Sequence, residues 1–167
     1  RHHVSGHLKI APEHISITVT ECMHKPPRQV LDDFGERFRA ASQAAGREQY
    51  ILPYLMSGHP GCTIADMVEL AEYLRDNSMY TEQVQDFTPT PMTISTAMYY
   101  TGLDPFTLQP VHIPRGEEKR IQRAMLQYRD PGNYDLVREG LERIGRKDLI
   151  GEGEKCLIPS RYRGAKH

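Results

Sequence analysis

The sequence predicts an α/β fold in which about three parallel strands are joined by crossover helices and followed by a small, mainly helical C-terminal extension. Apolar stretches of strand length alternate with longer stretches whose apolar residues recur at helical spacing, as in parallel sheets with right-handed crossovers. After residue 92 the strand-like stretches give way to helical ones. Because a closed barrel needs about eight strands, we expect a partial (β/α) barrel or an open sheet.

The first strand is expected in residues 7–14, where Leu8 and Ile10 alternate with polar residues. It should end at Pro12, because proline has no N–H to donate to a sheet. Ser16 is a suitable N-cap for a short helix after this strand.

A longer helix is expected over 29–45, with Gly46 at the position that favours a left-handed C-terminal cap. Its apolar residues recur at helical spacing. They are Val30, Leu31, Phe34, Phe38 and Ala41.

The second strand is expected over 50–56, which is nearly all apolar, as in a strand covered on both faces by helices. Pro53 within it indicates a bulge or a sheet edge. After the loop at 57–62, Thr63 and Asp66 form the pattern of a capping box. The helix that they open should carry a buried stripe of Ile64, Met67, Val68, Ala71 and Leu74.

A third strand is expected over 83–87, before a proline-rich stop. Beyond it we expect a turn-rich connection at 98–105 and a short edge strand at 111–114. A helix is expected over 117–128, and another from Asn133 to Gly145.

Composition excludes several classes of protein. The 167 residues are 38% apolar and 26% charged, and no apolar run approaches the ~20 residues of a membrane span. The first residues lack a signal-peptide pattern. The sequence has three cysteines that lie far apart: Cys22, Cys62 and Cys156. Their odd number and wide spacing argue against a disulfide framework and favour a reducing cytosol. We therefore expect a cytoplasmic protein with no membrane partner.

Function in parallel α/β folds collects at the carboxyl ends of the strands, which selects the loops at 11–16, 57–63 and 88–92. Glu13 and His14 offer a carboxylate beside an imidazole, suited to acid–base work or to a polar ligand. Alternatively they are a helix-entry pair, with Glu13 near the helix dipole and His14 solvated.

The loop from Ser57 to Gly61 places two glycines near a helix N-terminus, where exposed amides attract anionic or polar groups. It lacks the lysine of a phosphate-binding loop and the glycine pattern of a dinucleotide fold. His59 and Cys62 have the spacing of two zinc ligands, but a zinc site would need two or three more. No metal site is therefore expected in this chain.

Several long segments, in this order, resemble the C-terminal part of YgiQ-type radical SAM proteins, and the resemblance covers nearly the whole chain. They are HVSGHLKIAPEH at 3–14, MSGHPGCT at 56–63, VQDFTPTPM at 84–92, YRDP at 128–131 and GRKDLIG at 145–151.

The resemblance implies a radical SAM enzyme, in which a [4Fe–4S] cluster binds S-adenosylmethionine and cleaves it reductively. The family's C-x-x-x-C-x-x-C cluster motif is absent from this sequence. The resemblance therefore implies a fragment that is inactive alone and needs the missing N-terminal part of its parent chain. Residues 1–92 would be the later part of the barrel, 93–150 a helical extension, and 151–167 a basic, flexible tail.

The resemblance also implies which residues contact the cofactor, although it gives no catalytic residue. The strand end at Glu13 and His14 would make polar contacts, the turn at 57–61 would lie against the methionine or ribose part, and 85–89 would lie near the adenine. The implied set is Glu13, His14, Ser57, Gly58, His59, Pro60, Gly61, Gln85 and Phe87.

The charge distribution leaves a second interpretation open. The net charge is -1, yet acidic residues exceed basic ones over 1–114 and the reverse holds over 115–167. A non-catalytic module that binds RNA or a protein through this end is the alternative. The basic residues that would make this contact are Arg115, Lys119, Arg120, Arg123, Arg129, Arg161, Arg163 and Lys166.

Overall fold

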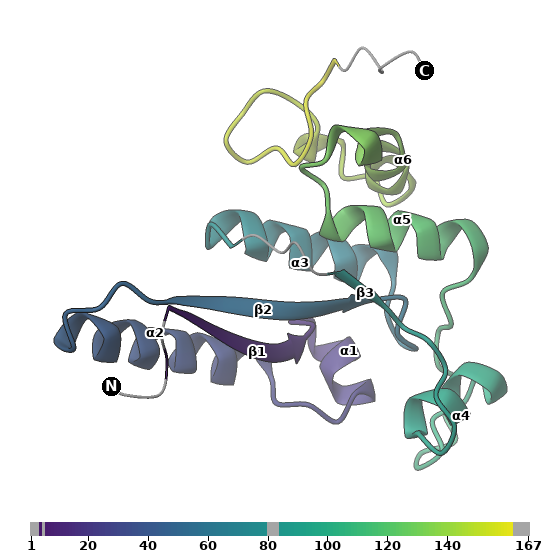
Figure 1. The fold of residues 1–167 in the computed structure, drawn as a ribbon. Coiled ribbons are helices and arrows are strands. Elements are labelled where there is room, and N and C mark those ends of the chain that lie inside the picture. The colour runs from purple at the N-terminus through teal and green to yellow at the C-terminus, as the bar shows by residue number, and fades with distance from the viewer. Residues whose placement is uncertain (1–3, 5, 80–83, 162–167) are drawn as a thin grey trace.

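The computed structural model describes residue 4 and residues 6–79 and 84–161. Within them, three parallel strands form one sheet in the order β1-β2-β3: β1 (His7–Glu13), β2 (Tyr50–Ser57) and β3 (Val84–Asp86). The helices are α1 (Ile17–Cys22), α2 (Arg28–Ala44), α3 (Ile64–Asp76), α4 (Ile94–Thr101), α5 (Gly116–Leu126) and α6 (Tyr134–Arg143). Short 3-10 turns lie at η1 (Pro131–Asn133) and η2 (Lys147–Leu149) (Figure 1). The predicted α/β class and helical C-terminal part are confirmed.

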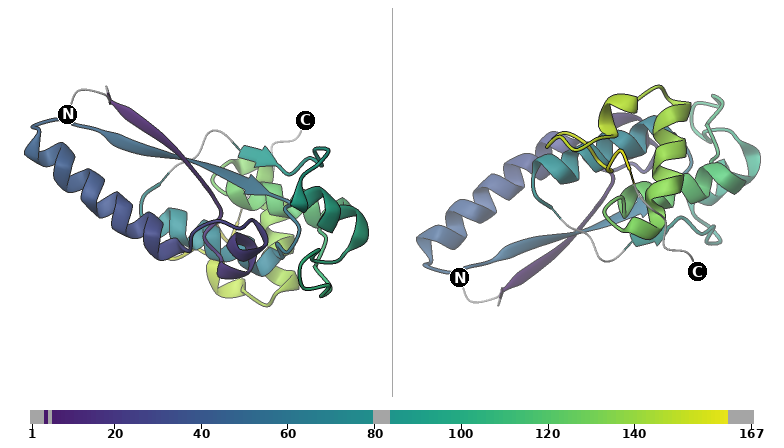
Figure 2. Two further views of the ribbon diagram at one scale, coloured as in Figure 1. Left: turned by 90° about the horizontal axis from the view of Figure 1, so that it is seen from below. Right: turned by 90° about the horizontal axis from the view of Figure 1, so that it is seen from above.

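The sheet has one packed face and one open face. In both views of Figure 2, α2 and α3 lie on the same side of the sheet, as right-handed crossovers require. Side chains that point the other way are exposed or half-buried. We call this set the open face: His7, Lys9, Ala11, Tyr50, Leu52, Tyr54, Met56 and Gln85. The expectation that β2 is covered on both faces is therefore wrong, because Tyr50 and Leu52 are exposed.

The main core lies between the sheet, α3, α5 and α6. The whole predicted stripe of α3 is buried, and so is the face of α5 that carries Ile121 and Met125. Figure 1 shows α5 between α3 and α6. Gly140 permits the close crossing of α5 and α6, since a Cβ there would lie 2.5 Å from Ile121 Cγ2 and 2.5 Å from Met125 Cε.

Helix α2 forms as predicted but packs loosely. Its side chains Val30 and Phe34 remain 51% and 40% exposed. A cavity of about 310 Å³ separates the start of α2 from the end of β1, and another of about 540 Å³ lies further along, beside Leu8 and Phe38. We call this pair of cavities the α2–β1 groove.

Two local predictions after residue 92 are wrong. The first half of the expected turn-rich connection at 98–105 lies in helix α4, which begins where the Thr93 hydroxyl accepts a hydrogen bond from Thr96 N–H. The expected strand at 111–114 does not form. Instead, a single antiparallel bridge joins Leu103 to Pro110. Aromatic and β-branched residues in α4 hide its helical character.

Two further expectations need adjustment. Pro53 lies in the central strand rather than at an edge, and the irregular register falls opposite it in β1, between Ile10 and Glu13. Leu157 and Ile158 of the tail that was expected to be flexible are buried, and Ile158 pairs with Ile150.

Residues 162–167 lie outside the described part, as does Gln83 of the expected third strand. Among the described residues, no helix has the length and apolar character to cross a membrane.

Candidate functional site

The end of β1 places an unusual carboxylate at the edge of the sheet. The register irregularity in β1 leads into Glu13, whose φ of 65° is a left-handed conformation that side chains rarely adopt. Lys25 Nζ lies 3.4 Å from Glu13 Oε1 and donates to the Ala11 carbonyl at 2.6 Å. Glu13 Oε2 is buried and lacks a hydrogen-bond partner within the described residues. Strained backbone and unpaired buried polar atoms cluster at functional sites, so this strand end is a candidate site.

His14 turns into the protein and is only 2% exposed, so the alternative of a solvated His14 is wrong. Ser16 N–H donates to its Nδ1 at 3.1 Å, which leaves the ring proton on Nε2, 3.8 Å from Cys62 Sγ. Burial lowers the pKa of His14 to about 4 and raises that of the Cys62 thiol well above its usual value. At neutral pH both groups are therefore uncharged.

Asp66 ties the first strand end to α3. Its carboxylate accepts hydrogen bonds from Ser16 Oγ at 2.5 Å, from Thr63 Oγ1 at 2.6 Å and from Thr63 N–H at 2.8 Å. The predicted capping box of Thr63 and Asp66 is thus confirmed. Burial alone would raise the pKa of Asp66, but these hydrogen bonds outweigh it and lower the pKa below its usual value.

The turn after β2 is buried and its side chains are already paired. Ser57 Oγ donates to Asp86, which also accepts from Arg123 at 3.0 Å. His59 Nδ1–H donates to the Pro60 carbonyl at 2.7 Å, so Nε2 accepts from the Ser95 hydroxyl at 2.8 Å. Burial lowers the pKa of His59.

The backbone amides of this turn are also engaged. Gly58 N–H donates to Gln122 Oε1 at 3.0 Å, Gly61 N–H to the His112 carbonyl at 2.7 Å, and Cys62 N–H to the His59 carbonyl at 3.0 Å. The expectation that exposed amides of the turn attract an anionic group therefore does not apply to these three amides.

The nine residues expected to contact a cofactor all lie at or near the carboxyl ends of the strands, but they differ in exposure. Gln85 is exposed and Glu13 is half-buried. The other seven are buried: His14, Ser57, Gly58, His59, Pro60, Gly61 and Phe87. Of the nine, only Glu13 and Gln85 are therefore not fully buried, and contact of any of the nine with a ligand stays a prediction.

Sequence reasoning missed the roles of the residues that hold these loops together. Gln122, Lys119, Asp86 and Lys25 each bind a strand end or the loop after it. Their partners are mainly backbone atoms distant in sequence. A glutamine or lysine on a helix gives no sequence signal of such a partner, so only the fold reveals the role.

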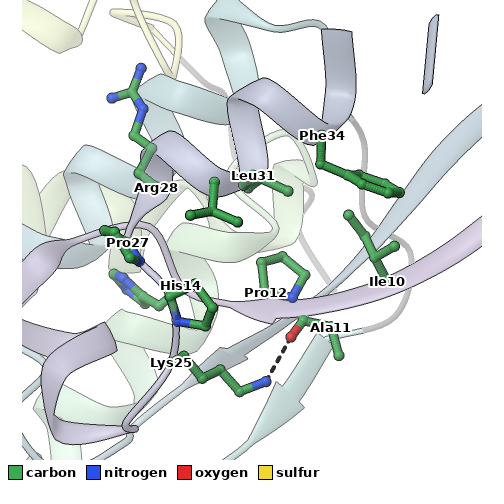
Figure 3. Close-up of a pocket in the computed structure, with 11 residues that line it drawn as sticks. Ile10, Ala11, Pro12, His14, Lys25, Pro27, Arg28, Leu31 and Phe34 are labelled. Atoms are coloured by element: carbon green, nitrogen blue, oxygen red, sulfur yellow. Dashed lines mark hydrogen bonds between the residues drawn. The ribbon is translucent and has the colours of Figure 1, made fainter. Parts of the chain in front are cut away.

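A pocket lies beside this site, on the helix side of the sheet. It is the first cavity of the α2–β1 groove, and Figure 3 shows Ile10, Pro12, Leu31 and Phe34 around it. His14 and the Lys25–Ala11 hydrogen bond lie along one side. Its lining is mainly apolar, unlike the strand-end site.

The described residues do not fit an iron–sulfur cluster. Cys22, Cys62 and Cys156 are free thiols, and no three His, Cys, Asp or Glu residues of the described part group as metal ligands. A [4Fe–4S] cluster takes several cysteine thiolates, whereas Cys62 is buried as a neutral thiol.

The fold and site define a class of protein: a one-sided parallel α/β sheet whose strand-end loops are bound by a C-terminal helical region. A family model described as a domain of unknown function, DUF3362, matches residues 82–166, and the chain belongs to this family. No solved structure matches the chain.

Curated relatives are UPF0313 proteins. The chain is 58% identical to one from Methanosarcina mazei over 99% of its own length and 26% of that protein. It is 55% identical to relatives from Clostridium perfringens and Geobacter sulfurreducens, over 94% and 90% of the chain and 24% and 25% of those proteins. The resemblance to the YgiQ-type family is thereby confirmed. The chain spans about a quarter of the length of these relatives.

Proposed function

We propose that this chain is the C-terminal part of a radical SAM protein and forms part of the wall that binds S-adenosylmethionine and substrate. Strands β1 to β3 are then later strands of a (β/α) barrel within residues 1–92, residues 93–150 are the helical extension, and 151–167 are the basic tail. The segment lacks the cysteine motif that would bind the cluster, so the N-terminal part of the parent protein would have to supply it, and the segment alone would be inactive.

The observation that carries this proposal is the open face of the sheet. In a (β/α) barrel the helices cover the outside, and alternate side chains of each strand point to the interior. Here α2 and α3 occupy one side of the sheet. By the alternation of side chains along the paired strands, Lys9, Tyr54 and Gln85 point to the other side. A sheet of this kind is expected of a barrel fragment and not of a doubly wound fold, which covers both faces with helices.

The α2–β1 groove supports the same proposal. Strand β1 forms an edge of the sheet, and the apolar stripe of α2 next to it is incompletely buried. An open edge beside unpacked apolar side chains is the surface on which a preceding β/α unit would pack. The greater length of the relatives provides chain for such a unit.

The strand-end site has a group that fits S-adenosylmethionine. This cofactor carries an ammonium group and ribose hydroxyls, which donate hydrogen bonds, and Glu13 Oε2 is a buried acceptor that needs a donor. Gln85, exposed at the end of β3, offers both a donor and an acceptor. When bound, S-adenosylmethionine supplies the radical chemistry with a cluster held elsewhere in the parent protein; the residues of this segment bind and orient it.

The test uses the full-length parent protein, reconstituted anaerobically with iron and sulfide, reduced with S-adenosylmethionine present and assayed for 5′-deoxyadenosine. Product should form, and Glu13→Gln should weaken S-adenosylmethionine binding because it removes the carboxylate charge. Glu21→Gln is the matched control, since Glu21 is an exposed residue nearby on α1. A well-folded parent protein with no cluster and no product would refute the proposal.

The alternative function, RNA or protein binding through the basic C-terminal end, gains less support. Lys119 donates to the Phe87 carbonyl, Arg123 pairs with Asp86, and Arg115 donates to the Tyr99 carbonyl. Arg163 and Lys166 lie outside the described residues. Salt-sensitive RNA binding by a parent protein that forms no 5′-deoxyadenosine would favour the alternative.

A further inference from the structure

Gln122 of α5 forms hydrogen bonds with both ends of the turn after β2. Its Oε1 accepts from Gly58 N–H at 3.0 Å, and its Nε2 donates to the Cys62 carbonyl at 2.8 Å and to Glu118 Oε1 at 3.3 Å. The side chain is completely buried. Rotation of the amide by 180° would set its NH₂ against Gly58 N–H and its oxygen against the Cys62 carbonyl, so the partners fix one orientation.

The neighbouring residues on the same face of α5 hold the end of β3. Lys119 Nζ donates to the Phe87 carbonyl at 2.8 Å, and its aliphatic stem lies against Gly58, where a Cβ would come within 2.9 Å of Lys119 Cε. Arg123 pairs with Asp86, which accepts from Ser57. Positions 119, 122 and 123 are three and four residues apart and therefore share one side of the helix.

We propose that α5 is a positioning element, in which Gln122 and Lys119 set the geometry of the two strand-end loops that the ligand site is built on. Helix α5 lies within the region of residues 82–166 matched by the family of unknown function, whereas the turn at 58–62 lies outside it. This assigns part of that region a role: it shapes a site on the preceding sheet. The inference rests on the proposed function where the ligand is S-adenosylmethionine.

The bonds of Gln122 explain why its role is specific. An apolar residue of similar size would fill the space but leave Gly58 N–H and the Cys62 carbonyl buried without partners. The turn would then shift to satisfy them elsewhere. Because β2 enters the turn and α3 leaves it, such a shift changes the position of the loop while the core of α3 keeps its packing.

The experiment compares Gln122→Met with Arg120→Met in the full-length parent protein. Arg120 is exposed on the same helix, so its replacement should change neither loop. Two readouts are used: hydrogen exchange of the peptide that covers 57–63, with the peptide over 64–76 as internal reference, and the dissociation constant of S-adenosylmethionine by equilibrium dialysis. Lys119→Met, which keeps most of the aliphatic stem and removes the amine, tests the end of β3 separately.

For Gln122→Met we expect exchange in 57–63 to accelerate about tenfold or more and S-adenosylmethionine binding to weaken about tenfold, with α3 unchanged. Unchanged exchange in 57–63 would overturn the proposal, as would faster exchange with unaltered affinity, which would make Gln122 structural only. If the unaltered parent protein binds no S-adenosylmethionine, the proposed function fails, and hydrogen exchange still decides whether α5 positions the loops.

Discussion

Helices α2 and α3 have similarly clear apolar stripes in the sequence and opposite fates in the structure. The stripe of α3 is buried against the sheet and α5, whereas Val30 and Phe34 of α2 remain half-exposed beside the α2–β1 groove. Both helices are crossovers on the same side of one sheet (Figure 2). They differ because α3 has α5 as a second partner and α2 has none of comparable extent in the described part.

This difference shows what the helical spacing of apolar residues does and does not predict. A stripe at helical spacing indicates that a helix has an apolar face to bury, but it does not say which chain segment buries it. For α3 the partner is the C-terminal helical region. For α2 we propose that the partner lies in the rest of the parent protein.

The largest effect should come from truncating one side chain in each of two regions: the main core around α3, α5 and α6, and the region around α2 and the α2–β1 groove. Leu141→Ala should lower the free energy of unfolding by about 2–5 kcal/mol, because Leu141 is fully buried in α6. Phe34→Ala should cost about 1 kcal/mol or less in the isolated chain, because the Phe34 side chain is already 40% exposed to water. Urea denaturation of each variant measures both values.

The same Phe34→Ala change in the full-length parent protein sharpens the comparison. If the rest of the protein fills the α2–β1 groove, Phe34 becomes a core residue there and its truncation should cost about 3 kcal/mol or more. An equally small cost in both proteins would mean that the groove stays open, and it would remove one support for the barrel.

Much of the fold could be predicted because local signals agreed with tertiary packing. The capping box of Thr63 and Asp66 and the apolar stripe of α3 needed no knowledge of distant residues. Helix α4 was missed because its residues have weak helix propensity, and its start depends on the Thr93 cap. The open face of β2 was missed because an apolar strand looks the same whether or not a partner covers both faces.

The candidate site was predicted less completely. The rule that function collects at strand ends directed attention to Glu13, His14 and the turn after β2, which the structure places at the carboxyl ends of neighbouring strands. Their part in binding stays a prediction. The rule does not predict that His14 and His59 are buried, or that Gly58 N–H donates a hydrogen bond to Gln122 Oε1. These facts depend on which helix lies over the strand ends, and no local pattern encodes that.

A smaller effect is expected from His14, which lies between the two regions, lining the groove while its Nε2 faces Cys62. Its pKa falls from 6.5 to about 4 on folding, so the unfolded chain binds more protons between those values. Stability should therefore decrease as the pH falls from about 6.5 towards 4, by about 2 kcal/mol from this group at pH 5. Comparing the free energy of unfolding of the wild type with that of His14→Gln across this pH range isolates the contribution of His14. An identical pH dependence in the variant would mean that His14 is hydrated in solution and that the groove reaches it.

The smallest effect concerns Asp66, which joins the two regions through its bond from Ser16 before α1 and its cap on α3. Its pKa is lowered on folding, so the charged form contributes stability that is present above about pH 4 and is lost as the pH falls through the folded-state value. Asp66→Asn keeps the shape of the side chain but weakens the three bonds, at a cost of about 1 kcal/mol at pH 7. The difference between wild type and variant should shrink below about pH 4. A constant difference down to pH 2 would show that the cost comes from altered packing at the start of α3, in which case the two regions would be joined by shape rather than by the charge of Asp66.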